Sequence, residues 1–339
     1  MKMNLSNKPE KTRRQIATTT TPPNILKILA TTDFSDESRS GVRYAVALAE
    51  KLGAAVALLH VIEPPSRIAG MEAVVLVRED SEAVGLPRRA QLARLAALGR
   101  AQLATLAKRE GKGDVAVTFT VRTGKPFQEI TTAAREQMAD LIVIATHGYT
   151  GVEHVLLGST TERVVRHAPC SVLTVSTRAK PKRTGKTPAF KLKKILVPID
   201  FSNTSKDALP RATLLAAHFG AELVLLHIVE KFPIDYLLGR GLMNETIVPL
   251  MKQAEADLEQ MAGRLSKSTG LKVSAVVSDG KPFEGICQTA KTLGVDLIVL
   301  TTHGYTGLKH VWLGSTAERV VRHAPCPVLT VREKNRKTM

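Results

Sequence analysis

Short apolar runs alternate along the first half of the chain with longer segments whose apolar residues recur every three or four positions. The runs are typical of buried parallel strands and lie at 28–30, 55–62, 115–121, 141–145 and 171–175. Helical periods fill the segments between them, including a long stretch rich in Ala, Leu and Arg before the third run. Parallel strands need crossover connections, so this alternation predicts a parallel sheet with helices on both faces.

The second half of the chain repeats the first. Asp33 aligns with Asp200 at an offset of 167, whereas Gly158 aligns with Gly314 at an offset of 156, so the second copy is 11 residues shorter between these points. Over the 31 positions that begin at 145 and at 301, the copies differ at only six. A duplicated unit of this size predicts an α/β fold of two tandem doubly wound domains, each with a five-stranded parallel sheet and helices on both faces.

The boundaries follow from this repeat and from local composition. We expect domains at 25–177 and 192–332, a basic disordered arm at 1–24, a basic linker rich in Pro, Lys and Thr at 178–191, and a basic tail at 333–339. The two ends and the linker region hold 15 of the net charge of +17, which leaves the predicted domains near neutrality. We interpret this charge as solvated ends. Aromatic residues are only 4% of the chain and none interleave the basic runs, which disfavours nucleic acid as the partner.

Composition excludes several classes of protein. Apolar residues make up 44% and charged residues 23% of the chain, as in globular domains and unlike disordered or collagen-like chains. No apolar run approaches the roughly 18 residues of a membrane-spanning helix, and the N-terminus lacks the apolar core of a signal peptide. The three cysteines are too few and odd in number for a disulfide framework. We therefore expect a soluble, cytoplasmic protein with reduced thiols and no membrane partner.

The segment after the fourth strand holds the strongest candidate for binding chemistry. Gly148 and Gly158 are separated by nine residues, and Gly158 leads directly into Ser159 and Thr160. Ser159 and Glu162 have capping-box spacing, which predicts a helix start with free backbone N–H groups beside a glycine. Phosphate is the expected guest there, at the carboxyl ends of the strands. The alternative is a tight turn and a well-capped helix that binds nothing. The second copy repeats these positions at Gly304, Gly314, Ser315 and Thr316.

These motifs resemble those of the universal stress protein family, here as a tandem two-domain member. The resemblance rests on a G-x-x-G loop, nine further residues and G-[ST], with an Asp that closes the first strand and a final strand of the APCPVLTV type. It covers 25–177 and 192–332 and implies a fold like that of the adenine nucleotide alpha hydrolases. In the nucleotide-binding branch of the family, the loop and the G-[ST] pair hold the phosphates and ribose of ATP.

The resemblance also implies a set of nucleotide-site residues. They are Asp33, Val61, Ala145, His147, Gly148, Gly158, Ser159 and Thr160 in the first copy, and Asp200, Ile228, Thr301, His303, Gly304, Gly314, Ser315 and Thr316 in the second. Ala145 and Thr301 depart from the pattern, because the family has glycine at the first loop position. Threonine adds branched bulk near the expected path of the ribose, so the second site is the weaker candidate. Part of the family lacks nucleotide binding altogether.

Fast catalysis is not expected at these sites. His147 and His303 suit a general base because histidine titrates near neutrality, but a role in shaping the loop explains them better. The chain lacks a GxxxxGK[ST] loop and an HxGH motif, and its histidine spacings match no zinc site. Any ATP hydrolysis, or phosphoryl transfer to Ser159 or Ser315, is therefore expected to be slow and incidental.

We interpret the chain as an ATP-binding stress-response sensor or regulator, with ATP as its cofactor and Mg²⁺ as an optional companion. The resemblance implies that the two copies pack as a pseudo-symmetric pair through their last strands, and we expect homo-oligomers. Two alternatives stay open. One is an interaction module that binds no nucleotide, and the other is a partner of nucleic acids or anionic surfaces through the basic tails.

Overall fold

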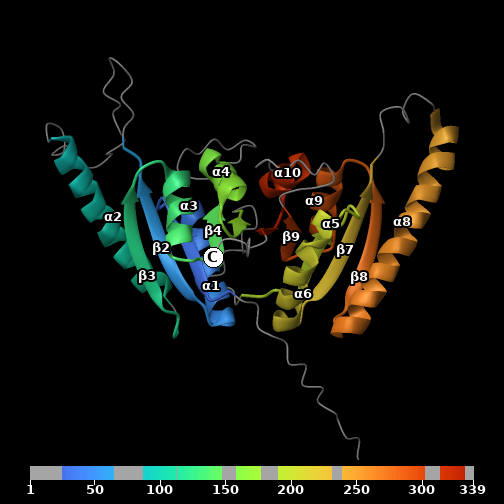
Figure 1. The fold of residues 1–339 in the computed structure, drawn as a ribbon, viewed down its shortest axis with the longest axis horizontal. Helices are drawn as coiled ribbons and strands as arrows, with labels where there is room; N and C mark the ends of the chain where they lie inside the picture. The colour runs from blue at the N-terminus through green and yellow to red at the C-terminus, as the bar shows by residue number, and fades with distance from the viewer. Residues whose placement is uncertain are drawn as a thin grey trace, which may run out of the picture.

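The computed structural model describes residues 25–64, 87–111, 113–146, 158–176, 190–230, 239–301 and 314–332, with the backbone alone at residues 88 and 239–246. Strands and helices alternate in both halves (Figure 1). The first half contains β1 (Lys27–Thr31), α1 (Asp36–Leu52), β2 (Ala55–Ile62), α2 (Arg88–Glu110), β3 (Val117–Thr123), α3 (Pro126–Glu136), β4 (Leu141–Ala145), α4 (Ser159–His167) and β5 (Ser171–Val175). The second half contains β6 (Lys194–Pro198), α5 (Asn203–Lys206), α6 (Ala208–Phe219), β7 (Glu222–Val229), α8 (Gly239–Thr269), β8 (Val273–Asp279), α9 (Pro282–Thr292), β9 (Leu297–Thr301), α10 (Ser315–His323) and β10 (Val328–Val331).

One helix of the first half is divided in the second. α1 runs without interruption, whereas its counterpart is split into the short α5 and the longer α6. Pro210 explains the break, because it has no N–H to donate and its ring collides with the carbonyl of Lys206 four residues earlier. The chain therefore turns at Asp207 before it continues as α6.

The strands form one ten-stranded sheet in the order β3-β2-β1-β4-β5-β10-β9-β6-β7-β8. All neighbours within each half are parallel, which confirms the predicted doubly wound α/β fold. β5 and β10 pair in antiparallel fashion and join the halves. In each half the strand order reverses between two central neighbours, β1 and β4 in the first half and β6 and β9 in the second. The crevice at the carboxyl ends of such a pair is the usual ligand position in this architecture.

Two apolar cores cover the two faces of the sheet, and each core extends through both halves. On one face α1, α2, α6 and α8 pack against the strands, with Leu103 and Leu258 fully buried. On the other face lie α3, α4, α9 and α10, whose valines Val164 and Val320 are fully buried. Each fully buried aliphatic side chain of this kind contributes about 1.5–3 kcal/mol relative to an exposed one.

The joint between the halves combines strand pairing with side-chain contacts. Leu173 pairs with Leu329 at the centre of the β5–β10 ladder. The Thr174 hydroxyl donates to the Val328 carbonyl at 3.2 Å, and the Thr330 hydroxyl donates to the Val172 carbonyl at 3.0 Å. All of these residues are buried, so the joint is part of the protein core.

Candidate functional site

The carboxyl ends of β1 and β4 meet, as the sequence requires for a site at the point where strand order reverses. Ile28 pairs with Leu141 and Ala30 with Val143, and both strands end within the next two residues. Asp33 lies two residues after the end of β1 and is half-buried there. In the second half Asp200 occupies the same place after β6, which lies beside β9. The loops after β4 and β9 are not described, so the predicted His147, Gly148, His303 and Gly304 lie outside the described residues.

Asp33 is held by a tight turn into α1. Its Oδ1 accepts from the Ser35 hydroxyl at 2.6 Å and from the Ser35 backbone N–H at 3.1 Å. Ser35 is the N-cap of α1 and its oxygen also accepts from the Ser38 N–H at 3.2 Å. Between them Phe34 has φ of 66°, a left-handed conformation that a non-glycine residue adopts rarely. The turn leaves the carboxylate fixed in position as a hydrogen-bond acceptor at the end of β1.

The second copy builds the same turn. Asp200 Oδ1 accepts from the Ser202 hydroxyl at 2.6 Å, and Phe201 has φ of 62°. Burial pushes the pKa of Asp200 upward, but hydrogen bonds from Ser202 and Ser205 outweigh burial and place this pKa below its usual value. The carboxylate is therefore ionised across the neutral range.

Two residues that sequence reasoning missed support this turn. The Phe34 ring lies against the His60 imidazole with centroids 4.5 Å apart, and His60 Nδ1 donates to the Thr32 carbonyl at 2.9 Å. Burial lowers the pKa of His60, although the Thr32 carbonyl and the Asp33 charge oppose the shift. Phe201 and His227 repeat the contact at 4.6 Å. The sequence does contain a signal for this contact. Asp-Phe-Ser occurs in both copies, and each copy has a histidine at the same place in its second strand.

The start of α4 differs from the prediction in one respect. Gly158, and not Ser159, is the N-cap, and no side chain caps the helix. Glu162 pairs instead with Arg166 one turn later, at 2.8 Å, so the capping-box prediction was wrong. The second copy has the same arrangement. Gly314 is its N-cap, and Glu318 pairs with Arg322 at 2.7 Å. A favourable ion pair at i,i+4 competes with the capping box for the same carboxylate.

Gly158 is required by a close backbone approach. Its N–H donates to the Thr146 carbonyl at 3.0 Å, and a Cβ on Gly158 would lie 3.3 Å from that same oxygen. The N–H groups of the next three residues have no intrahelical acceptor, because they form the first turn. Ser159 is exposed and Thr160 is half-buried, as are Ser315 and Thr316 in the second copy. The first turn of α4 thus begins at partly exposed residues, and its N–H groups are of the kind that can bind an anion.

The two copies differ where β4 and β9 end. In the first copy the Thr161 hydroxyl donates to the Ala145 carbonyl at 2.8 Å and ties α4 to the end of β4. The Ala145 methyl is buried and lies beside Gly41 of α1. In the second copy Thr301 replaces Ala145, and Ala317 replaces Thr161, so the same tie cannot form.

The copies also differ at the apolar wall of the site. Val61 and Ile228, at the ends of β2 and β7, are both half-buried and pack on the core under α3 and α9. Ile228 lies over Gly285, whereas the first copy has Glu129 at the position of Gly285. Arg122 pairs with Glu129 at 3.5 Å, so the first copy carries charged groups near this wall. The two candidate sites are thus chemically unequal.

The part of the chain that the structure describes holds no cluster of three or more His, Cys, Asp or Glu side chains able to bind a metal ion. Cys170 and Cys326 are buried, and burial raises the pKa of Cys326 to about 12. Both thiols act as core residues. Within the described residues, no helix has the length and apolar character needed to cross a membrane.

Comparisons with known proteins agree with this arrangement. The model of the universal stress protein family matches residues 24–176 and 191–332. A universal stress protein from Mycolicibacterium smegmatis is 28% identical over 318 residues, which cover 91% of this chain and 97% of that one. A solved universal stress protein from Archaeoglobus fulgidus shares the fold, with a TM-score of 0.61, 21% identity, and coverage of 91% of this chain and 97% of that one. Another solved universal stress protein is in complex with cAMP; it is 22% identical, with a TM-score of 0.31, and covers 42% of this chain and 98% of its own.

Proposed function

The chain belongs to the universal stress protein family, and we propose that it is a stress-response regulator that binds ATP at the site of its first copy. The observation that carries the proposal is the meeting of two elements at one sheet end. The hydrogen-bond acceptor Asp33 after β1 and the first turn of α4 follow adjacent strands, β1 and β4. A nucleotide has a hydrogen-bond donor at its base and anions at its phosphates, so it matches both elements.

Each residue has a distinct role in this proposal. Asp33 accepts a hydrogen bond from the adenosine end, and Val61 contributes apolar contact there. The backbone N–H groups of Ser159 and Thr160 face the phosphates, and the helix dipole adds about 0.3–1 kcal/mol of attraction for an anion. Gly158 has no Cβ to press against the Thr146 carbonyl, which allows the close backbone approach at the start of α4. His147 and Gly148 complete the loop in the family pattern. The phosphates of bound ATP are negatively charged, so a companion Mg²⁺ would be held by them.

The first copy is proposed as the stronger site. Thr161 holds α4 against the Ala145 carbonyl, which keeps the first turn in place before the ligand arrives. In the second copy Asp200, Gly314, Ser315 and Thr316 are present, but the tie is missing and Thr301 replaces the small residue. Ile228 also brings a larger side chain than Val61 to the wall. We therefore propose weaker binding at Ile228, Thr301, His303 and Gly304.

We further propose that the β5–β10 joint is the intramolecular form of the contact by which single-domain relatives dimerise. The support is the near-symmetric order of strands on either side of it. We also propose that chains associate into homo-oligomers. The proposed location is the cytoplasm. The location is supported by three free cysteines, of which two are buried.

The test is to denature the purified protein and measure released adenine nucleotide per chain. We expect about one nucleotide per chain, because one site is stronger, and its loss in Gly158→Val. The matched control is Gly314→Val, which places the same bulk in the second copy and should retain the nucleotide. Circular dichroism shows that each variant is folded. Release of no nucleotide, after purification and after reloading with ATP, would leave the interaction module as the correct reading.

A further inference from the structure

A groove of about 250 Å³ lies between the start of α1 and the outer helix α2. Phe34, the residue after Asp33, forms one of its walls and packs on the core face covered by α1 and α2. Val61, the apolar wall of the proposed nucleotide site, packs on the opposite face of the sheet. The groove and the nucleotide site therefore lie on opposite sides of the end of β1. The groove is a separate site, and an occupant of one does not fill the other.

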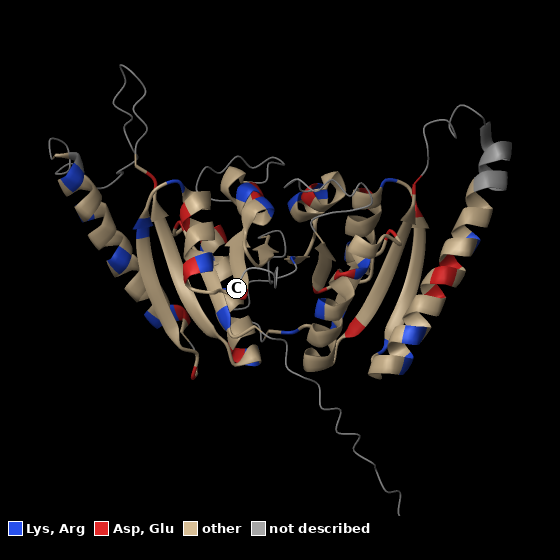
Figure 2. Cartoon of the chain, in the orientation of Figure 1, with Lys and Arg blue, Asp and Glu red and all other residues tan. Residues whose placement is uncertain are grey.

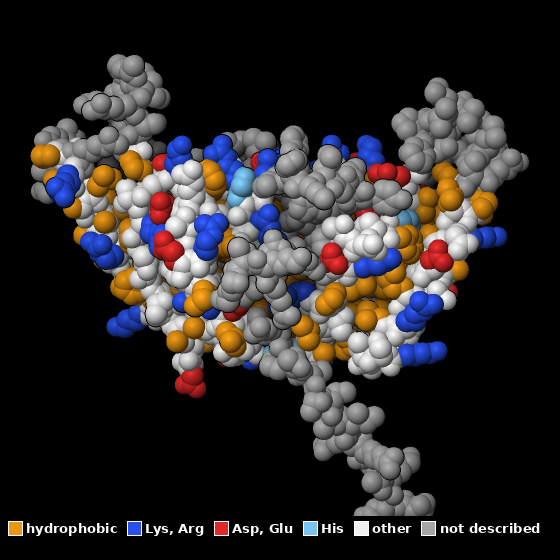
Figure 3. Space-filling view, in the orientation of Figure 1, with side chains coloured by type: hydrophobic (Ala, Val, Ile, Leu, Met, Phe, Trp, Pro, Cys, Tyr) orange, Lys and Arg blue, Asp and Glu red, His pale blue; other side chains and the backbone are white. Residues whose placement is uncertain are grey.

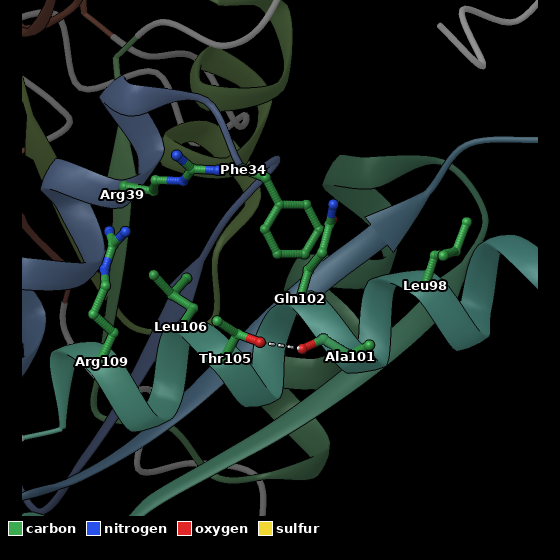
Figure 4. Close-up of a pocket in the computed structure, with 8 residues that line it drawn as sticks. All are labelled: Phe34, Arg39, Leu98, Ala101, Gln102, Thr105, Leu106 and Arg109. Carbon is green, nitrogen blue, oxygen red and sulfur yellow. Dashed lines mark hydrogen bonds between the residues drawn. The ribbon is translucent and has the colours of Figure 1, made fainter. Parts of the chain in front are cut away.

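The lining combines an apolar surface with a cationic end. Leu98, Leu106 and the Phe34 ring supply apolar surface, and Leu98 is 44% exposed. In Figure 4 the Phe34 ring lies midway along the groove, with Leu98 toward one end and Arg39 and Arg109 at the other. Gln102 and Thr105 lie on the α2 side. The ligand chemistry that fits such a lining is an apolar ring with a single negative charge at one end.

The arginines differ in how far they are already neutralised. Arg109 pairs at 2.7 Å with the buried Glu110, to which Arg43 also lies at 3.8 Å. Arg39 pairs with Asp36 at 3.5 Å, but the Asp36 side chain is 92% exposed. An exposed ion pair of this kind contributes little, because water screens it. Arg39 can therefore turn to a ligand anion at small cost.

The charge along the whole of α2 adds to the positive potential of these arginines. It carries six Arg or Lys residues and one Glu, whereas its counterpart α8 carries four basic and four acidic residues. Figure 2 shows the difference along the two outer helices, and in Figure 3 basic side chains project from α2 at the outer edge. The net charge of the folded parts is near zero, but α2 beside the groove is locally positive. A positive surface raises the local concentration of anions.

We propose that this groove binds a small aromatic monoanion, a planar ring that bears one carboxylate or a group of the same charge. The ring packs on Phe34 between Leu98 and Leu106, where offset or edge contacts between aromatic rings are favourable. The carboxylate meets the Arg39 guanidinium in a charge-assisted hydrogen bond, and Arg109 adds attraction at longer range. The Gln102 amide offers a further donor, whereas the Thr105 hydroxyl already donates to the Ala101 carbonyl at 3.0 Å. The site does not depend on nucleotide binding.

The probe for this proposal is 2-naphthoate, titrated into the full-length protein and followed by calorimetry and by NMR shifts of residues on α1 and α2. Naphthalene-2-methanol tests the need for charge, and acetate tests the need for the ring. Arg39→Gln removes the cationic partner. Ala101→Phe fills the groove from an exposed helical position. Arg100→Gln removes an equal charge from an exposed position of α2 that does not line the groove.

We expect saturable binding of 2-naphthoate, and binding roughly tenfold weaker in Arg39→Gln, which is the usual effect of losing one charge-assisted hydrogen bond. Ala101→Phe should abolish binding, and Arg100→Gln should leave it unchanged. The same results are expected with ATP absent and present. Equal affinity for the neutral alcohol, equal loss in Arg100→Gln, or no saturable binding would each overturn the proposal.

Discussion

The Ile228 side chain occupies the space directly above Gly285: a Cβ built on Gly285 would lie 2.6 Å from Ile228 Cδ1. Gly285 sits within α9, where glycine costs about 1 kcal/mol relative to alanine. The contact between β7 and α9 explains why the helix keeps a residue that weakens it. The first copy resolves the same contact with the shorter Val61 and a larger residue, Glu129, on α3.

Gly285→Ala should therefore destabilise the protein by about 1 kcal/mol, because crowding of Ile228 outweighs the gain in helix propensity. Ile228→Val in the same chain should reverse the loss. Urea unfolding measures both. The matched control is Gly263→Ala on α8, where no atom lies within 4 Å of the added methyl and the position is exposed. That variant should gain roughly 0.5–1 kcal/mol. A gain of the same size in Gly285→Ala would contradict the packing argument.

Thr161→Val should weaken both stability and nucleotide retention. The substitution removes the hydroxyl that donates to Ala145, and the loss of one buried hydrogen bond costs about 1–2 kcal/mol. Thr161→Ser keeps the donor and should retain most of both properties. Unfolding in urea and nucleotide released per chain are the measurements. Retention that is equal in the Val and Ser variants would show that the tie does not position α4 for a ligand.

The stability of the first copy should fall as pH drops through the range in which His60 titrates. Burial holds the pKa of folded His60 below the ordinary 6.5, so the unfolded chain binds more protons in this range. The associated stability is fully present above pH 6.5 and is lost as pH falls toward the folded pKa. Unfolding free energies from pH 7.5 to 5 should therefore decline more steeply in the wild type than in His60→Gln. Parallel declines in the two proteins would refute this assignment.

Leu329→Asp should separate the unfolding of the two halves. Leu329 is 2% exposed and pairs with Leu173 across the joint, so a carboxylate there is buried without a partner and costs several kcal/mol. Calorimetry should then show two transitions where the wild type shows one. Thr330→Val serves as the control, because it removes one hydroxyl at the joint without adding a charge, and it should keep a single transition. One unshifted transition in Leu329→Asp would mean that the Leu329 contact does not couple the unfolding of the halves.

Much of the architecture could be predicted from local pattern. The order of strands and helices, the duplication and the parallel arrangement within each half are confirmed, because apolar spacing over a few residues specifies each element. The family prediction is also confirmed. Boundaries moved slightly: the third strand was expected at 115–121 and lies at Val117–Thr123. The binding of ATP, and the residues that would hold it, stay predictions.

The sequence by itself determined what each segment becomes and that Asp33 and Gly158 follow strands of the same sheet. Packing through the last strands was expected from the family resemblance. Only the tertiary structure decided that β5 and β10 pair antiparallel within one ten-stranded sheet, that Gly158 rather than Ser159 caps α4, and that Phe34 turns toward α2 to form a groove. The physical reason is sequence separation. Val172 and Thr330 are 158 positions apart, and no local periodicity encodes the register in which the last strands of the two halves pair.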